Sequence, residues 1–364
     1  MEEKDFIDAG LYDPAAPDAA GRLALLGWLV ARGITLEQMT RHTKGLSGLA
    51  GDLALRPGPR FSPREVAERE AIALEDVMTL SLASGFAPAD PDEPTFTEAD
   101  TSVFAAFMGG AGMFGRDAVL RFTRVVGSSM ARIAEAAVSL FQAEVEQKLI
   151  DSGASELHLA QQNLTAIENL GNVRSLLHNL FAVHMETAIR RIREARLSRS
   201  PDAVRFAVGF VDLVGFTTIT RDIHAHELDL LVSRFENIAY DVVAMHDGRL
   251  VKLIGDEVMF VTRSTEAACS IALTLFERFA LDGGVTPRGA IAYGDMLVRG
   301  GDYYGPIVNL ASRVAQIAVP NELLVTAEVA SLATGGALSF EAAGKRMLKG
   351  FDAPIALMTA ARAK

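Results

Sequence analysis

The feature that most constrains the fold is a change in hydrophobic periodicity near residue 204. Up to about residue 195, apolar residues recur at the three- or four-residue spacing of amphipathic helices. Beyond residue 204, short runs typical of strands alternate with helical stretches. This change predicts an N-terminal all-α domain at 1–185 and a C-terminal α+β domain at 204–364, joined by a basic linker at 186–203.

In the helical half, the segment SPREVAERE opens with a serine cap, a proline at the first helical position and acidic residues in the first turn. Residues 125–150 predict one long helix with a buried face, along which Gly127 would let another helix approach closely. The apolar positions of that face are Val126, Met130, Ile133, Ala137, Phe141 and Val145. A second helical pattern leads into residues 190–202, whose five arginines fit either a solvated helix end or a hinge.

The second half predicts strands in RFAVGFVDL, GRLVKLIG, EVMFVT, TPRGAIAYG, MLVRG, NELLVTA and PIALMTA, with helices between several of them. The order strand, helix, strand, strand, helix, strand is that of a ferredoxin-like βαββαβ domain. We therefore expect one sheet with helices packed on one face.

Composition narrows the class of protein further. The formal net charge of −11 argues against a surface built to hold nucleic acid or anionic lipid. The one cysteine, Cys269, excludes an intramolecular disulfide and fits a buried core position in a reducing compartment. The chain opens with an acidic segment, and no uncharged apolar run reaches the roughly 18 residues that span a bilayer. We expect a soluble, cytoplasmic protein without a membrane span.

Asp212 is a lone carboxylate at the end of the apolar run FVDLV. The residues that follow, Gly215, Phe216 and Thr217, predict a turn and a helix N-terminus, whose free N–H groups can hold phosphate oxygens. A carboxylate beside a phosphate would repel it unless a divalent cation bridged the two. The alternative is that Asp212 caps the helix.

A second carboxylate of this kind, Asp256, lies in KLIGDEVMF at the tip of a predicted hairpin. A Gly-Asp pair also occurs in hairpins for conformational reasons alone. In a ferredoxin-like sheet, however, Asp212 and Asp256 would meet on neighbouring central strands and could share two metal ions, as phosphoryl chemistry requires. Strand alternation points Glu257 away from Asp256, so we leave it out of the predicted site.

A third signal is GGDYYGPIVNLASRVAQ, in which Asn309 and Arg313 share one helix face. An amide and a guanidinium facing a cleft suit a ribose oxygen and a phosphate that gains charge in its transition state. The alternative is a surface arginine with an asparagine near a helix start.

Three blocks, FVDLVGFT, VKLIGDEVMF and DYYGPIVNLASR, resemble in order and spacing the signature blocks of the class III nucleotidyl cyclase catalytic domain. The resemblance covers residues 204–360 and implies a role for each matching residue. These roles are binding of two Mg²⁺ or Mn²⁺ ions by Asp212 and Asp256, purine selection by Lys252 and Asp302, ribose positioning by Asn309, and transition-state stabilisation by Arg313. Lys349 in RMLKGFD resembles the additional triphosphate-binding lysine of the family.

Lys252 and Asp302, called the purine pair from here on, indicate the substrate. A lysine and an aspartate can bond the adenine ring acceptor and its exocyclic amine, whereas guanine suits an acidic residue and a small polar one. Lys252 and Asp302 therefore predict ATP, cyclised to 3′,5′-cyclic AMP and pyrophosphate. The resemblance also implies a homodimer with composite active sites at its interface. The short segment GDMLVRGGDYYG is similar to the bacterial subgroup with an abbreviated dimerisation arm.

The first half is similar to the helical regulatory domain of some actinobacterial cyclases of this class, which implies control of the catalytic half. Its apolar helices could enclose a lipid-like ligand or form a plain packed core. His178 and His184 precede the arginine-rich linker and could sense pH, or be ordinary helix residues.

Two further functions stay open. The catalytic half could bind nucleotide without turnover. The segment FSPREVAEREAIALEDVMTLSLASGF resembles a helix-turn-helix, which would make the chain a DNA-binding regulator. Glu75 and Asp76 open the would-be recognition helix and would repel phosphates, so no nucleic acid partner is expected.

Overall fold

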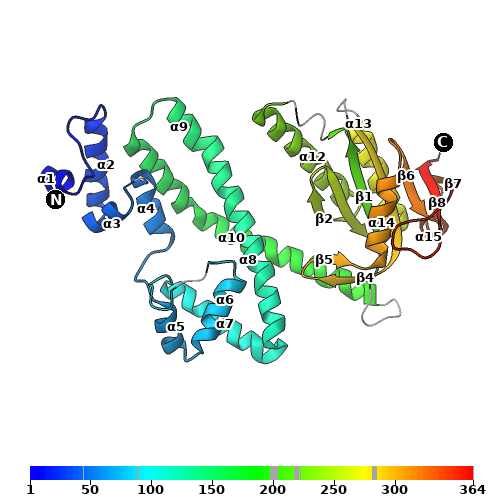
Figure 1. Cartoon of the computed structure of the whole chain (residues 1–364), viewed down its shortest axis with the longest axis horizontal. Coiled ribbons are helices and arrows are strands. Elements are labelled where there is room, and N and C mark those ends of the chain that lie inside the picture. The colour runs from blue at the N-terminus through cyan, green and yellow to red at the C-terminus, as the bar shows by residue number, and fades with distance from the viewer. Residues whose placement is uncertain are drawn as a thin grey trace. The chain divides into compact units, whose positions relative to one another are not determined.

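The computed structural model describes residues 1–43, 45–87, 90–196, 204–216, 221, 223–280 and 285–363. The chain forms two compact units, Met1–His184 and Met185–Lys364. The regular elements described in the first unit are helices, with one β-bridge between Phe61 and Phe96, and the strands gather in the second unit (Figure 1). The predicted fold class, a helical first half followed by an α+β second half, is confirmed.

The first unit contains two separate apolar cores. One unites the first four helices with the start of α10 around Leu25, Leu29 and Leu49. The other unites α5 to α8 around Val77, Phe104 and other buried residues. The helical elements are α1 (Glu3–Asp8), α2 (Ala19–Ala31), α3 (Leu36–Arg41), α4 (Leu46–Leu55), α5 (Pro63–Glu70), α6 (Leu74–Ala83), α7 (Glu98–Phe114), α8 (Arg116–Phe141), the π-helical η1 (Gln142–Glu146), α9 (Gln147–Asp151) and α10 (Glu156–Arg196).

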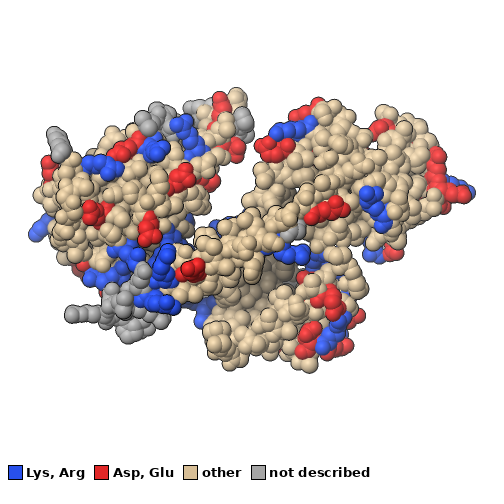
Figure 2. Space-filling model, turned by 180° about the vertical axis from the view of Figure 1, so that it is seen from behind, with Lys and Arg blue, Asp and Glu red and all other residues tan. Residues whose placement is uncertain are grey.

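The prediction of one long helix with a buried face over residues 125–150 is wrong. The α-helix ends at Phe141, where η1 and α9 follow. Val126 and Met130 are 39% and 45% exposed, because they line an open apolar cavity beside α6 and α7 rather than a helix-packing seam. The close approach expected at Gly127 is confirmed, since a Cβ there would lie 2.3 Å from the carbonyl oxygen of Ser84. On the face drawn in Figure 2, wide areas carry no Lys, Arg, Asp or Glu side chain.

Helix α10 continues through the first part of the arginine-rich segment and ends at Arg196. Residues 197–203 of the predicted linker lie outside the described residues. Within the described ranges, no helix is both long enough and apolar enough to cross a bilayer.

The second unit is built on one mixed sheet with the strand order β2-β3-β1-β4-β6-β8-β7, to which β5 adds by pairing with β4. The β4–β6 pair is parallel and the other pairs are antiparallel. Its elements are β1 (Val204–Val214), α12 (Ala225–Met245), β2 (Arg249–Ile254), β3 (Glu257–Thr262), α13 (Thr265–Ala280), β4 (Thr286–Arg299), β5 (Asp302–Tyr304), α14 (Pro306–Ile317), β6 (Leu323–Thr326), α15 (Ala327–Leu332), β7 (Leu338–Arg346) and β8 (Ile355–Arg362). The two strands expected in TPRGAIAYG and MLVRG form the single strand β4, whereas β5, β7 and α15 were not predicted.

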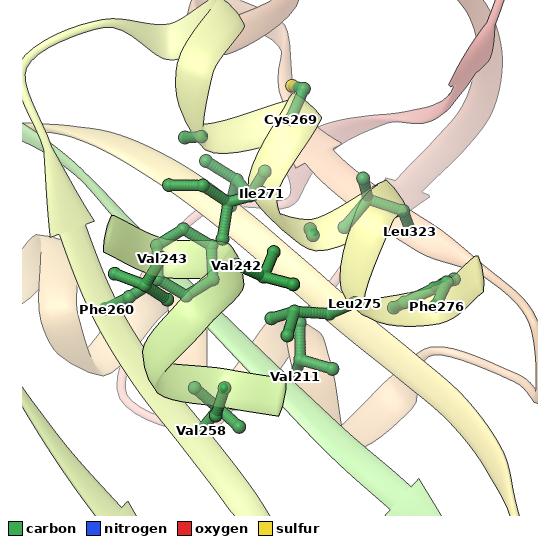
Figure 3. Close-up of a cluster of buried hydrophobic side chains, with 14 of the residues drawn as sticks. Val211, Val242, Val243, Val258, Phe260, Cys269, Ile271, Leu275, Phe276 and Leu323 are labelled. Carbon is green, nitrogen blue, oxygen red and sulfur yellow. The ribbon is translucent and has the colours of Figure 1, made fainter. Parts of the chain in front are cut away.

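Helices pack on both faces of this sheet, so the expectation of one covered face is wrong. Ala207, Val211 and Leu213 of β1 join the core formed with α12 and α13, part of which Figure 3 shows. The alternate residues Phe206, Val208 and Phe210 join a second core with α14. β1 is apolar on both sides, which is typical of a strand buried between two layers.

Cys269 lies in α13 within the first of these cores, as the sequence predicts. Burial raises the pKa of its thiol to about 12, and the nearby carboxylate of Glu266 acts in the same direction. The thiol is therefore an inert packing group at neutral pH.

Candidate active site

Three carboxylates come together where β1 meets the β2–β3 hairpin. Asp212 of β1 lies directly opposite Glu257 of β3, and opposed residues of an antiparallel pair project from the same face. Asp256 lies in the hairpin turn beside Gly255, whose φ of 65° is left-handed. Burial raises the pKa of Asp256, and the charge of Asp212 raises it further. The two predicted carboxylates are therefore close enough to interact.

Glu257 belongs to the same group, contrary to the expectation that excluded it. Burial, followed by the charges of Asp212 and Asp256, raises its pKa to about 7. The sequence argument considered alternation along β3 and missed the cross-strand register, which sets Glu257 opposite Asp212.

Arg288 is a fourth charged member that the sequence argument missed. It lies on β4 directly opposite Asp212 of β1. Its Nε and Nη2 donate to Oδ2 of Asp212 at 2.9 and 2.7 Å. Its Nη1 donates to the carbonyls of Gln316 and Ala318 at 3.2 and 3.5 Å, at the C-terminal end of α14. A cation is favoured at that end of a helix dipole, so Arg288 ties the carboxylates to α14.

The carboxylate group fits a hydrated divalent cation rather than a preformed metal cage. Among the described residues, no three His, Cys, Asp or Glu side chains are arranged to hold a metal ion. Mg²⁺ commonly takes only one or two protein carboxylates and completes its shell with water and substrate phosphates. Asp212 and Asp256 supply such oxygens. Burial is the main cause that raises the pKa of Asp256 and of Glu257, and the charges of neighbouring carboxylates act in the same direction, so a cation bound here would offset their repulsion.

The predicted purine pair forms one ion pair in the structure. Lys252 Nζ donates to Asp302 Oδ2 at 2.6 Å, and the backbone N–H of Tyr303 donates to Asp302 Oδ1 at 2.8 Å. Although partial burial acts against it, the bonds from Lys252 and Tyr303 and the charges of Lys252 and Arg249 hold the pKa of Asp302 below its usual range. The Lys252 side chain is 42% exposed, so it remains partly accessible to solvent.

Helix α14 carries Asn309 and Arg313 one turn apart, with Asn309 exposed and Arg313 half-buried. A Cβ on Gly350 would lie 3.9 Å from Arg313 Nη2, so the loop that contains the exposed Lys349 runs beside this guanidinium. α14 packs on the face of the sheet from which Asp212 and Lys252 project, since their cross-strand partners Glu257 and Met259 lie two residues apart on β3.

The structure describes only part of the turn after β1 that was predicted to bind phosphate. Gly215 follows β1 with a φ of 96°, a conformation that favours glycine. The Phe216 ring is buried against Phe235, with centroids 6.2 Å apart, so only its backbone could face a ligand. Thr217 lies outside the described residues. In the other unit His178 is exposed on α10, as is His184.

Comparison with known proteins places this geometry in a family. Residues 3–189 match the family model of the adenylate cyclase regulatory domain. The chain is 32% identical to an uncharacterized protein of Mycobacterium tuberculosis, covering 95% of this chain and 91% of that protein. It is 32% identical to an adenylate cyclase of Glutamicibacter nicotianae over 74% of this chain and 71% of the relative. A pH-sensitive adenylate cyclase of M. tuberculosis is 29% identical over 98% of this chain and 92% of its own length.

The chain therefore belongs to the adenylate cyclase family, among the members that carry this N-terminal regulatory domain. It is an enzyme of that class, as the three sequence blocks predict.

The raised pKa of Glu257 gives a prediction about stability. Its pKa rises from 4.5 in the unfolded chain to about 7 in the folded one, so ionisation costs stability above pH 4.5 and costs most above pH 7. Glu257→Gln removes this cost. Without divalent cations, we expect a gain of about 1–2 kcal/mol in the free energy of unfolding near pH 8 and a small change near pH 5, after allowing for solvent screening. Urea denaturation at both pH values measures the difference.

The matched control is Glu341→Gln. Glu341 is exposed on β7, so this substitution should change the free energy of unfolding little at either pH. A gain from Glu257→Gln that is equal at both pH values would contradict the electrostatic account of the carboxylate group.

Proposed function

We propose that the protein converts ATP to 3′,5′-cyclic AMP and pyrophosphate. The ribose 3′ oxygen attacks the α-phosphorus in line, so an O–P bond forms as the bond to the β-phosphate oxygen breaks and the 3′ proton leaves to solvent. The observation that carries the proposal is spatial. In each protomer the carboxylate group, the Lys252–Asp302 pair and helix α14 lie on one face of the sheet, although they come from four separate segments. Two protomers that face each other would therefore bring the carboxylates of one against the purine pair and α14 of the other.

The chain's own residues would position the nucleotide and neutralise its charge. Lys252 would donate to the adenine ring acceptor while Asp302 accepts from the exocyclic amine, after their mutual 2.6 Å bond opens. Asn309 would orient the ribose, and Arg313 would stabilise the charge that grows on the α-phosphate.

The triphosphate would be held by backbone N–H groups after Gly215 and by Lys349. Phe216 would contribute through its backbone, because its ring is buried. We include Thr217 in this turn on the sequence resemblance alone.

Asp212 and Asp256 would hold the cations, with Glu257 adding negative charge beside them. Two bound Mg²⁺ or Mn²⁺ ions would lower the pKa of the 3′-hydroxyl and neutralise the leaving phosphates. Arg288 fixes the orientation of Asp212 through two donors on a single oxygen.

We propose a homodimer in which the carboxylates of one protomer and the purine pair, Asn309 and Arg313 of its partner form each site. Exposed apolar side chains support a covered surface near these elements. Ile254 follows Lys252 by two residues and is 49% exposed, and Tyr304 in β5 is 49% exposed. Apolar groups of this size are commonly buried at interfaces.

A turnover assay tests this proposal. Purified protein with Mg²⁺ or Mn²⁺ should cyclise ATP and discriminate against GTP. Asp256→Asn should lower kcat by roughly 100-fold or more, because several kcal/mol of charge stabilisation depend on the bound cation. The matched control is Asp247→Asn, an exposed carboxylate paired with Arg263 at 3.5 Å, which should leave turnover unchanged.

Nucleotide binding without turnover in the wild type would instead support an idle cyclase domain. GTP cyclised as well as ATP would refute the role of Lys252 and Asp302.

The DNA-binding alternative has weaker support, because basic side chains around the helix-turn-helix-like segment are engaged by carboxylates. Arg64 pairs with Asp92 at 2.7 Å and Arg116 with Asp76 at 2.6 Å. Asp76 also opens α6, the helix that would have to enter the major groove.

We further propose that a lipid-like ligand in the helical unit controls the enzyme. The open cavity beside α6, α7 and α8 has a volume of about 900 Å³, within the range of small-molecule sites. Its lining is mainly apolar and includes Phe104, Phe107, Phe114, Phe122 and Met130. Arg56, which pairs with Asp100, also lines it, as does the buried hydroxyl of Thr95, which has no hydrogen-bond partner among the described residues. The Thr95 hydroxyl could bond the polar head group of a lipid-like ligand.

Filling this cavity should weaken lipid binding. Ala131 lines the cavity, and Ala131→Phe should reduce the affinity for a long-chain fatty acid by about tenfold, because overpacking costs about 1–3 kcal/mol. Ala136→Phe, on the same helix outside the lining, is the control. Calorimetric titration measures both, and equal affinities in the two variants would place the ligand elsewhere.

We also propose that His178 and His184 contribute to a pH response, because histidine changes charge near neutral pH and both side chains are exposed on the helix that leads toward the catalytic half. The full-length variant with His178→Gln and His184→Gln should have a flatter activity profile between about pH 6 and pH 8 than the wild type. Superimposable profiles would exclude these histidines from the response.

A further inference from the structure

The β4–β5 hairpin reaches across the sheet to strand β2. Among the described strands β5 pairs with β4 alone, and β4 is separated from β2 by β1 and β3. Nevertheless two β2 side chains contact the hairpin: Lys252 bonds Asp302, and Arg249 Nη2 donates to the carbonyl oxygen of Gly301 at 2.6 Å. The hairpin therefore folds over the face of the sheet that carries the proposed nucleotide site.

A β-bulge in β2 allows both contacts. Residues three apart on a regular strand project from opposite faces, which would separate Arg249 from Lys252. The pairing between β2 and β3 shifts between Leu250 and Lys252, so that Arg249 opposes Val261 and Lys252 opposes Met259. These two residues of β3 share a face, and both belong to the core beneath the hairpin.

The turn before Asp302 has little stiffness of its own. Gly300 and Gly301 have φ values of 61° and 82°, a left-handed conformation without side chains to restrain it. Two contacts, here called anchors, restrain this turn. The first lies on its C-terminal side, where the buried Tyr303 ring stands edge-on to the Phe206 ring with centroids 5.5 Å apart. Arg249 is the second anchor: it holds the Gly301 carbonyl, and its guanidinium lies 5.5 Å from the centre of the Tyr303 ring.

Asp302 lies between these two anchors. Its own backbone N–H belongs to the peptide group whose carbonyl Arg249 holds, and its Oδ1 accepts from the N–H of Tyr303. Rotation of the Gly301–Asp302 peptide would carry the carboxylate away from Lys252. The charge of Arg249 also helps to keep this carboxylate ionised, and therefore an acceptor for an exocyclic amine.

We propose that Arg249 is a positioning residue for purine selection, which holds Asp302 in the orientation that distinguishes adenine from guanine. This inference rests on the proposed role of Lys252 and Asp302. Arg249 itself touches neither the base nor the phosphates in this account. Its loss should weaken ATP recognition and the preference over GTP, while the chemical step proceeds once ATP is bound.

The test uses the full-length enzyme with Arg249→Gln, Arg249→Lys and the control Arg263→Gln. Arg263 is an arginine of the same unit that pairs with Asp247 at 3.5 Å. For each protein, kcat and KM are measured with ATP and with GTP, and the melting temperature is recorded. For Arg249→Gln we expect about a tenfold rise in KM for ATP, a similar fall in the ATP-over-GTP ratio of kcat/KM, and kcat for ATP within about twofold of the wild type.

Arg249→Lys keeps a donor for the Gly301 carbonyl and should recover part of the ATP-over-GTP ratio of kcat/KM. Arg263→Gln should match the wild type in this ratio and in KM for ATP. An unchanged ratio in Arg249→Gln, or an equal loss of kcat with both nucleotides alongside a lower melting temperature, would overturn the proposal. If the wild type itself does not prefer ATP, the purine role of Lys252 and Asp302 fails first. If the wild type prefers ATP over GTP and Arg249→Gln keeps that preference, the proposed role of Arg249 is refuted while the role of Lys252 and Asp302 stands.

Discussion

The gathering of three half-buried carboxylates at one point of the sheet is the constraint on which the catalytic unit depends. Asp212, Asp256 and Glu257 come from β1 and from the β2–β3 hairpin, and burial together with their shared charge raises the pKa of the latter two. Arg288 offsets part of this repulsion through its bonds to Asp212. Such a group lowers the stability of a packed sheet, and the proposed cation binding would account for its retention.

Sheet topology brings the other groups to the same face of the sheet within each protomer. The chain leaves β4, turns through β5 and α14, and returns as the parallel strand β6, so one crossover carries both Asp302 and the Asn309–Arg313 pair. This crossover covers one face of the sheet, while α12 and α13 cover the other. β1 can lie between two layers because most of its side chains are apolar on both sides, and its charged residues, Arg205 and Asp212, lie near its two ends.

Residue order and periodicity were sufficient to predict the two halves, the main strands, the hairpin at Asp256 and the helix with Asn309 and Arg313. They were insufficient wherever a contact depends on cross-strand register. Glu257 was excluded by alternation along its own strand, and Arg288 and Arg249 carry no local motif that marks their partners. The predicted buried face of residues 125–150 failed for a related reason: helical spacing identifies an apolar stripe but not whether protein or an open cavity lies against it.

Cation binding at the carboxylate group can be measured without turnover. Electron paramagnetic resonance of Mn²⁺, titrated into protein with a 3′-deoxy ATP analogue, reports ions held jointly by protein and phosphates. The account predicts that the wild type binds Mn²⁺ beyond what the free nucleotide binds, and that the variant with Asp212→Asn and Asp256→Asn does not. Equal Mn²⁺ binding by the two proteins would contradict the assignment of these carboxylates.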